Sequence, residues 1–156
     1  MSFPAQIQSF WQAYLATRPH DNQPSLDPDP IWQFGDTNEV ATRVGHLAQT
    51  GIKSATSGLV WEMEYNGLQP PQVGDLAIVT DGAGEPLCVV EITEVVIKPF
   101  NEIDEQFAFD YGENTRTLAQ WRVDSWDYFM PCCAAIGREP SETMPLVCQR
   151  FRCVYP

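Results

Sequence analysis

The apolar residues near the start of the chain recur with the period of a helix. Between residues 4 and 17 they are spaced by three and four positions, which is the pattern of one face of an α-helix. Residues 18–30 contain four prolines among polar and acidic residues, a density that disfavours both helix and central strand. We therefore expect residues 1–30 to form an amphipathic helix with a proline-rich linker, and residues 31–156 to form the main domain.

The main domain is predicted to begin with a helix that ends at Gly51. Asp36 occupies the expected N-cap position and Glu39 follows three residues later, as in a capping box. Gly51 follows the last residues of the apolar pattern, where a glycine commonly closes a helix in the left-handed conformation. Residues 59–65 are compatible with either a helix or a strand.

The remaining segments show no regular strand–helix–strand repeat. Strands are predicted at residues 76–80, 87–97 and 146–155, and helices at residues 103–109 and 117–135. Residues 81–84 form a turn between the first two strands, and Pro131 is expected to bend or end the last helix. This order favours an α+β domain built around a small barrel or curved sheet.

The charge of the chain limits its partners. Nine basic and 21 acidic residues give a net charge of −12, so the chain repels polyanions as a whole. General duplex binding and membrane binding are therefore disfavoured, although a local basic pocket remains compatible with an acidic protein. The basic residues that could supply such a pocket are Lys53, Arg116, Arg122 and Arg138.

The cysteines indicate a reducing compartment. Five cysteines, two of them adjacent and none in a C-x-x-C spacing, fit neither a disulfide framework nor a zinc site. The N-terminus lacks the pattern of a signal peptide, and no apolar run is long enough to span a bilayer. We expect a cytoplasmic protein whose thiols are buried as small apolar groups, with neither a cofactor nor a bound metal.

Residues 51–58 are the segment with the clearest potential for chemistry. Lys53, Ser54, Thr56 and Ser57 lie between two glycines, which permit close approach of a ligand to the backbone. A lysine that is removed from water can lose its proton near neutral pH and act as a base toward a hydroxyl. The ordinary alternative is a lysine that complements a helix dipole, beside polar loop residues.

Acidic and aromatic residues elsewhere could complete such a site. A carboxylate beside the lysine could orient it, and the candidates are Asp75, Glu91, Asp110 and Glu113. Tryptophans such as Trp61 could stack on a base, although most tryptophans in a domain of this size belong to the core.

The segment Gly51-Ile52-Lys53, followed by Thr56, resembles the G-x-K-x-x-T signature of ASCH domains. Further motifs of the longer ASCH proteins occur across residues 31–155, in the order in which they occur in that family. They are Trp32-Gln33-Phe34-Gly35-Asp36, Pro71-x-x-Gly74-Asp75, Glu91-Ile92-Thr93-Glu94-Val95, Gly112-Glu113, Thr117-Leu118 and Trp121-Arg122.

The resemblance implies a PUA-like β-barrel with flanking helices, an N-terminal helical extension and a cleft that binds RNA or a nucleotide fragment. It also implies two activities, because some members resemble ribonucleases and short members are amidohydrolases that deacetylate acetylated cytidine. In the amidohydrolase pattern Thr56 is the nucleophile and Lys53 its activator. The glutamate of that pattern aligns with Tyr111, and a shift in register would make Asp110 or Glu113 its replacement.

The sequence therefore predicts one site and three alternative functions. The predicted catalytic residues are Lys53, Thr56, Tyr111 and Glu113, and the predicted substrate-binding residues are Ser54, Ser57, Trp61, Asp75, Arg122 and Ser125. The first function is RNA or nucleotide binding with ribonuclease activity. The second is hydrolysis of an N-acylated cytidine nucleoside. The third is a non-enzymatic binding module, in which Ile7, Trp11 and Tyr14 of the first helix contact a protein or a second copy of the chain.

Overall fold

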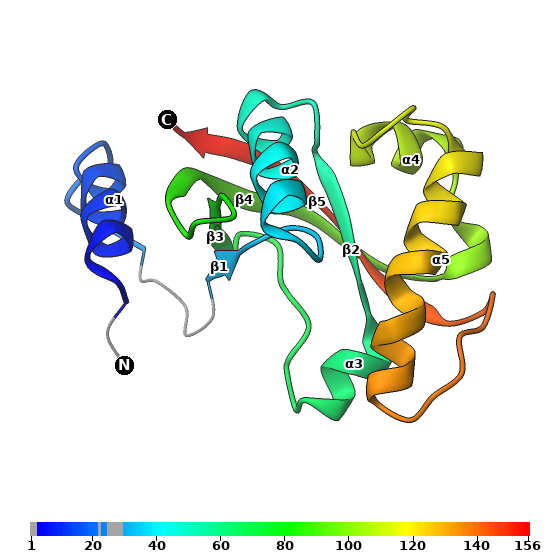
Figure 1. Ribbon diagram of the computed structural model, residues 1–156. Helices are drawn as coiled ribbons and strands as arrows, with labels where there is room; N and C mark the ends of the chain where they lie inside the picture. The colour runs from blue at the N-terminus through cyan, green and yellow to red at the C-terminus, as the bar shows by residue number, and fades with distance from the viewer. Residues whose placement is uncertain (1–2, 22, 25–29) are drawn as a thin grey trace. The chain divides into compact units, whose positions relative to one another are not determined.

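The computed structural model describes residues 3–21, 23–24 and 30–156, which form a mixed α+β fold (Figure 1). The helices are α1 (Ala5–Leu15), α2 (Asn38–Thr50), α3 (Val60–Tyr65), α4 (Glu105–Tyr111) and α5 (Leu118–Ala135), with a short 3₁₀ helix at Phe100–Glu102. The strands are β1 (Ile31–Trp32), β2 (Ala55–Leu59), β3 (Leu76–Thr80), β4 (Pro86–Pro99) and β5 (Pro145–Tyr155), in the sheet order β1-β3-β4-β5-β2. The predicted α+β class with an N-terminal helix is confirmed.

The chain forms two compact units. The first unit contains Met1–Gly51, Asp75–Glu91 and Arg152–Pro156, and the second unit contains Ile52–Gly74 and Ile92–Phe151. The boundary expected between residues 30 and 31 stays a prediction. Among the described residues, no helix combines the length and the apolar character that crossing a membrane requires.

Helix α1 packs into the core of the first unit. Ile7, Trp11 and Tyr14 are buried together with Ile78 of β3 and Val89 of β4. Strands β3 and β4 are antiparallel, and their register places Ile78 opposite Val89. Contact of these three α1 side chains with a partner would therefore require α1 to leave this core.

Helix α2 begins one residue later than its sequence pattern suggests. The hydroxyl oxygen of Thr37, rather than the carboxylate of Asp36, caps the helix by accepting a hydrogen bond from the Val40 amide at 3.1 Å. The other end is as predicted, because Gly51 adopts the left-handed conformation with φ of +86°.

The second unit is built on an antiparallel pair of strands, of which β5 was predicted and β2 was not. Strand β2 pairs with β5, from Ala55 opposite Arg150 to Leu59 opposite Leu146. Its Thr-Ser-Gly composition resembles a loop, and its strand partner lies about ninety residues further along the chain. The ambiguous segment after it is a helix, α3, and Pro131 does not end α5, which continues to Ala135.

Helices α4 and α5 share the core of the second unit with these strands. The buried side chains of this core include Leu59 of β2, Phe107 of α4, Trp121 and Phe129 of α5, and Leu146 of β5. All five cysteines are free, and Cys88, Cys133 and Cys148 are buried. Burial raises the pKa of the Cys148 thiol to about 11, so this thiol stays protonated and behaves as a small apolar group.

Candidate active site

Lys53 lies at the start of the second unit, where the chain enters β2. Backbone hydrogen bonds fix the neighbouring Ser54, whose amide donates to the Asp110 carbonyl at 2.7 Å and whose carbonyl accepts from the Phe151 amide at 3.0 Å. The Lys53 side chain is 0% exposed. A lysine is almost never fully buried unless it is paired, so its surroundings decide its role.

Gly112 brings the end of α4 against this segment. Asp104 caps the start of α4 by accepting from the Phe107 amide at 2.8 Å, and Gly112 closes its end with φ of +75°. A Cβ atom on Gly112 would lie 2.5 Å from the Ile52 carbonyl oxygen and 2.7 Å from the Lys53 Cα. Only glycine fits there, and the close approach places Tyr111 and Glu113 on either side of it beside Lys53.

The Lys53 ammonium contacts a carboxylate, a carbonyl and an aromatic ring. Its Nζ donates to Glu113 Oε2 at 2.8 Å and to the Tyr111 carbonyl at 3.1 Å. It also lies 3.5 Å from the centre of the Tyr111 ring, which is a cation–π contact. Burial lowers the pKa of Lys53 from its usual value to about 8, although the charge of Glu113 opposes this change.

Tyr111 connects the lysine to the hydroxyl groups of β2. The Tyr111 hydroxyl lies 3.1 Å from Ser57 Oγ, and it also interacts with the Thr56 hydroxyl. Burial and then the charge of Glu113 raise the pKa of Tyr111, so its hydroxyl remains neutral and can donate or accept a hydrogen bond. Lys53, Thr56, Ser57, Tyr111 and Glu113 therefore form one connected group, which we call the Lys53 site.

The carboxylate that contacts Lys53 is that of Glu113, one of the two residues expected as a replacement for the glutamate that aligns with Tyr111. Asp110, the other alternative, forms an ion pair with the Arg150 guanidinium. The Ser54 hydroxyl makes only a weak contact of 3.4 Å with the Asp110 carbonyl. Ser54 thus joins the backbone of the site rather than its reactive groups.

The other predicted binding residues are more scattered. Ser125 is buried in α5, one turn beyond Trp121, whose ring packs against Tyr111 at 5.9 Å. Arg122 is exposed on α5, and Trp61 of α3 stacks on the Arg138 guanidinium at 4.5 Å. Asp75 belongs to the first unit.

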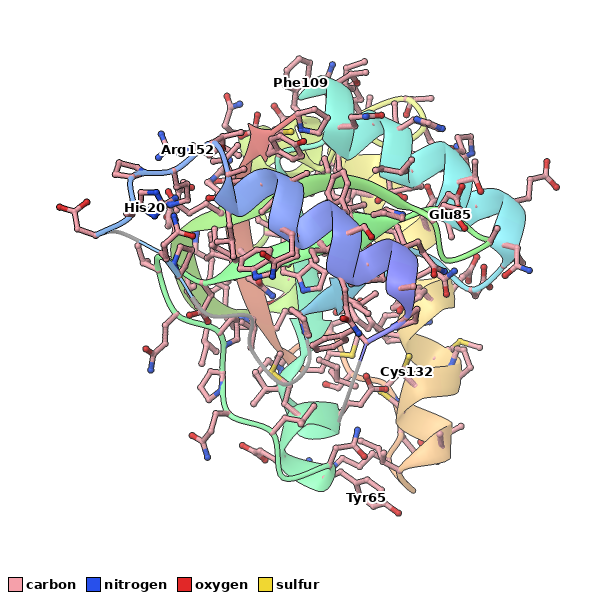
Figure 2. All side chains as sticks on the ribbon, turned by 90° about the vertical axis from the view of Figure 1, so that its left-hand side faces the viewer. His20, Tyr65, Glu85, Phe109, Cys132 and Arg152 are labelled. Carbon is pink, nitrogen blue, oxygen red and sulfur yellow. The ribbon has the colours of Figure 1, made fainter. Side chains whose placement is uncertain are left out.

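Arg116 is the predicted cation that lies nearest in sequence to the Lys53 site. Its guanidinium stacks 3.6 Å above the ring of Phe109, which is 49% exposed and projects outward in Figure 2. It also donates to the Phe109 carbonyl at 2.9 Å, and among the described residues it forms no ion pair.

Two buried polar atoms of the second unit could not be foreseen from the sequence pattern. Trp121 Nε1 and Gln149 Oε1 are buried without a hydrogen-bond partner among the described residues. Gln149 stands directly opposite Thr56 in the β2–β5 register. Neither can be recognised before the pairing of the strands and the packing of α5 are known.

The described part of the chain contains no group of three or more His, Cys, Asp or Glu side chains that could hold a metal ion. The Lys53 site itself offers an amine, a carboxylate and hydroxyl groups. These are the components of nucleophilic catalysis, in which a base activates a hydroxyl and a third group orients the base.

The model of the ASCH domain family matches residues 30–155. The chain therefore belongs to the ASCH domain family, as the sequence motifs indicated. Comparison with curated proteins gives no significant match.

Two solved structures resemble the chain over nearly its whole length. The ASCH domain from Lactobacillus crispatus JV V101 is 29% identical with a TM-score of 0.94, and the match covers 100% of this chain and 98% of that one. Protein EF3133 from Enterococcus faecalis V583 is 32% identical with a TM-score of 0.86, and the match covers 96% of this chain and 88% of that one. Because the first match covers the whole chain, it includes the N-terminal helix as well as the ASCH domain.

Proposed function

We propose that the protein hydrolyses the amide bond of an N-acylated cytidine, with Thr56 as the nucleophile and Lys53 as its activator. The observation that carries this proposal is the buried Lys53 amine held by Glu113 at 2.8 Å. With a pKa of about 8, part of the Lys53 population is neutral at physiological pH and can accept a proton. The Lys-x-x-Thr motif of the ASCH family supports the same pair of residues.

The proposed reaction proceeds in two steps. Lys53 takes the proton of the Thr56 hydroxyl as its oxygen attacks the acyl carbon, and then protonates the departing nitrogen as the C–N bond breaks. Cytidine leaves, and an ester between the acyl group and Thr56 remains. Water then hydrolyses this ester, which releases the carboxylic acid and restores the threonine.

Glu113 and Tyr111 have supporting roles in this proposal. Glu113 holds the amine in place and stabilises the protonated lysine that forms during each step. Tyr111 stays neutral and interacts with the hydroxyls of Thr56 and Ser57, so it can hold the nucleophile in one orientation.

The surroundings of Lys53 favour an amidohydrolase over a phosphate-binding site. A carboxylate, a carbonyl and a ring already surround the ammonium, and a phosphate would have to approach the negative charge of Glu113. A neutral nucleoside also needs no basic surface, which suits a chain with a net charge of −12.

A second candidate function, RNA binding with cleavage, is supported by Arg116 and Phe109. Phe109 is an exposed aromatic ring beside Arg116, which has no carboxylate partner among the described residues, and such a pair is a common element of single-strand binding sites. In this alternative the RNA backbone contacts Arg116, and the Lys53 site cleaves it with a neighbouring hydroxyl.

Incubation with N4-acetylcytidine, followed by chromatography for cytidine, tests the first proposal. We expect wild-type protein to release cytidine, Lys53→Met and Thr56→Val to lose the activity, and Ser57→Ala to retain most of it. Labelled single-stranded RNA is incubated in parallel with wild type and Lys53→Met. Cleavage of RNA by wild type alone, without deacylation, would replace the first proposal with the second.

A further inference from the structure

A buried hydrogen-bond acceptor lies opposite the proposed nucleophile in the sheet, and no described residue donates to it. Gln149 is only 7% exposed, and its Oε1 has no hydrogen-bond partner among the described residues. A buried carbonyl oxygen without a donor costs about 1–3 kcal/mol. Such an atom in a folded protein calls for an explanation, and a bound ligand or water that donates to it is one.

The strand register places this atom next to Thr56. Residues that face each other on antiparallel strands project their side chains to the same face, with Cβ atoms about 4.5–5.5 Å apart. Gln149 and Thr56 are such a pair in β5 and β2. The Gln149 amide therefore lies within reach of a group bonded to the carbon that Thr56 attacks.

Cytosine and uracil differ in the hydrogen-bonding group that they carry on C4 of the base. Cytosine carries an N–H donor on its C4 substituent, whereas the corresponding position of a uracil-type base is a carbonyl acceptor. An N-acylated cytosine keeps one N–H on the nitrogen of the bond to be broken. Two acceptors facing each other in a buried site would both remain without a donor, which penalises uracil.

We propose that Gln149 Oε1 accepts a hydrogen bond from the N–H on C4 of a cytosine base and thereby makes the site specific for cytidine over uridine. This inference rests on the proposed function, because it takes Thr56 as the residue next to the reacting bond. It assigns Gln149 to substrate recognition and predicts a preference that binding alone can reveal.

Calorimetric titration with cytidine and with uridine tests this assignment without requiring catalysis. Wild type is expected to bind cytidine at least tenfold more tightly than uridine. Gln149→Met removes the acceptor at similar volume, so it should weaken cytidine binding about tenfold and change uridine binding less than threefold. Gln106→Met, at an exposed position of α4, is the matched control and should keep the wild-type preference.

Four outcomes overturn the inference: wild type binds both nucleosides equally, binds neither, prefers uridine, or Gln149→Met weakens both alike. The last outcome would mean that Gln149 supports the strand pair only. If Gln149→Met does not fold, Gln149→Asn moves the acceptor back by one methylene and should reduce the cytidine preference. A cytidine preference without any release of cytidine from N4-acetylcytidine would refute the proposed hydrolysis but leave the role of Gln149 standing.

Discussion

Two ion pairs lie at the C-terminal end of α4 in the second unit, and they differ in the type of cation and in its burial. Lys53 pairs with Glu113 at 2.8 Å, with side chains 0% and 28% exposed. Arg150 pairs with Asp110, three residues earlier than Glu113, with side chains 29% and 21% exposed. Arg150 also lies 3.4 Å from the exposed Glu94.

The comparison shows that a carboxylate partner alone does not give a cation that can exchange a proton, because a lysine amine removed from water is needed as well. Loss of hydration lowers the pKa of Lys53 despite the carboxylate beside it. Arg150 keeps contact with water, so its pairs are screened and contribute about 0–1 kcal/mol. The Arg150 pair holds the chain in place, whereas the Lys53 pair costs stability and provides an amine that can exchange a proton.

Among the substitutions at the two ion pairs, Lys53→Met is expected to have the largest effect on activity. Lys53→Met removes the base, so kcat/KM for N4-acetylcytidine should fall about 10³-fold. The lowered pKa of Lys53 means that its charged form destabilises the fold, and Glu113 is 28% exposed and stays hydrated without its partner, so the free energy of unfolding at pH 7 should rise by about 1–3 kcal/mol. Urea denaturation checks the stability, and a clear loss of stability would mean that the lysine serves mainly to support the fold.

Gly112→Ala should separate the two members of the Lys53 pair. The added Cβ would overlap the backbone of Ile52 and Lys53, so we expect a loss of about 2 kcal/mol or more and a 100-fold fall in activity. Gly137→Ala is the matched control, because Gly137 also has a positive φ of +73° but nothing within 4 Å of an added Cβ. Equal effects of the two variants would show that backbone strain alone is responsible.

The free energy of unfolding should depend on pH because the pKa of Lys53 differs between the folded and unfolded protein. Its pKa is about 8 in the folded protein and 10.5 ordinarily, so unfolding takes up a proton between these values. The free energy of unfolding therefore gains about 3 kcal/mol from this group as the pH rises from 8 to 10.5. The stability advantage of Lys53→Met should shrink over the same window, and an advantage that stays constant would contradict the altered pKa.

The pH dependence of kcat/KM should also report the titration of Lys53. Because the neutral amine is the base, kcat/KM should rise about tenfold for each pH unit below 8 and then level off. A pH–rate profile of wild type measures this directly. A flat profile between pH 6 and 9 would exclude Lys53 as the base.

Tyr111→Phe is expected to have a smaller effect. The variant keeps the ring beneath the ammonium but removes the hydroxyl that contacts Ser57 and Thr56. We expect a roughly tenfold loss of kcat/KM and a change in stability within about 1 kcal/mol. Unchanged kcat/KM would remove Tyr111 from the positioning of the nucleophile.

Asp110→Asn should have the smallest effect, because it weakens the solvated pair and leaves the Lys53 pair intact. Stability should change by about 0–1 kcal/mol, and kcat/KM should stay within threefold of wild type. Glu113→Gln is its matched partner, with an expected loss of at least tenfold. Similar losses in both variants would mean that the two pairs do not differ in function.

Local patterns in the sequence were sufficient for most helices and for the strands of the first hairpin. Gly51 closes α2 as predicted, and β3 runs from Leu76 to Thr80, the range predicted for this strand. Strand β2 was not predicted, because its own residues favour loops and it is stabilised by pairing with β5, which lies far along the chain. The capping residue Thr37 was missed because Asp36 and Glu39 offer an equally plausible box.

The Lys53 site was only partly predictable for a similar reason. The motif identified Lys53 and Thr56, but the choice between Asp110 and Glu113 depends on the backbone directions after α4. The left-handed turn at Gly112, followed by positive φ angles at Asn114 and Arg116, sets these directions. Gln149 could not be recognised at all, since its importance lies in a strand register that joins residues far apart in the chain.

The pKa of the Lys53 amine is the most direct test of the account. Lys53 and Lys98 are the two lysines of the chain, so ¹³C-labelled lysine gives two side-chain Cε signals, and Lys53→Met identifies one of them. The Lys53 signal should titrate near pH 8, and Glu113→Gln should lower its midpoint further, because the charge of Glu113 raises the pKa. A Lys53 signal that titrates above pH 10, like that of a fully hydrated lysine, would contradict the central claim.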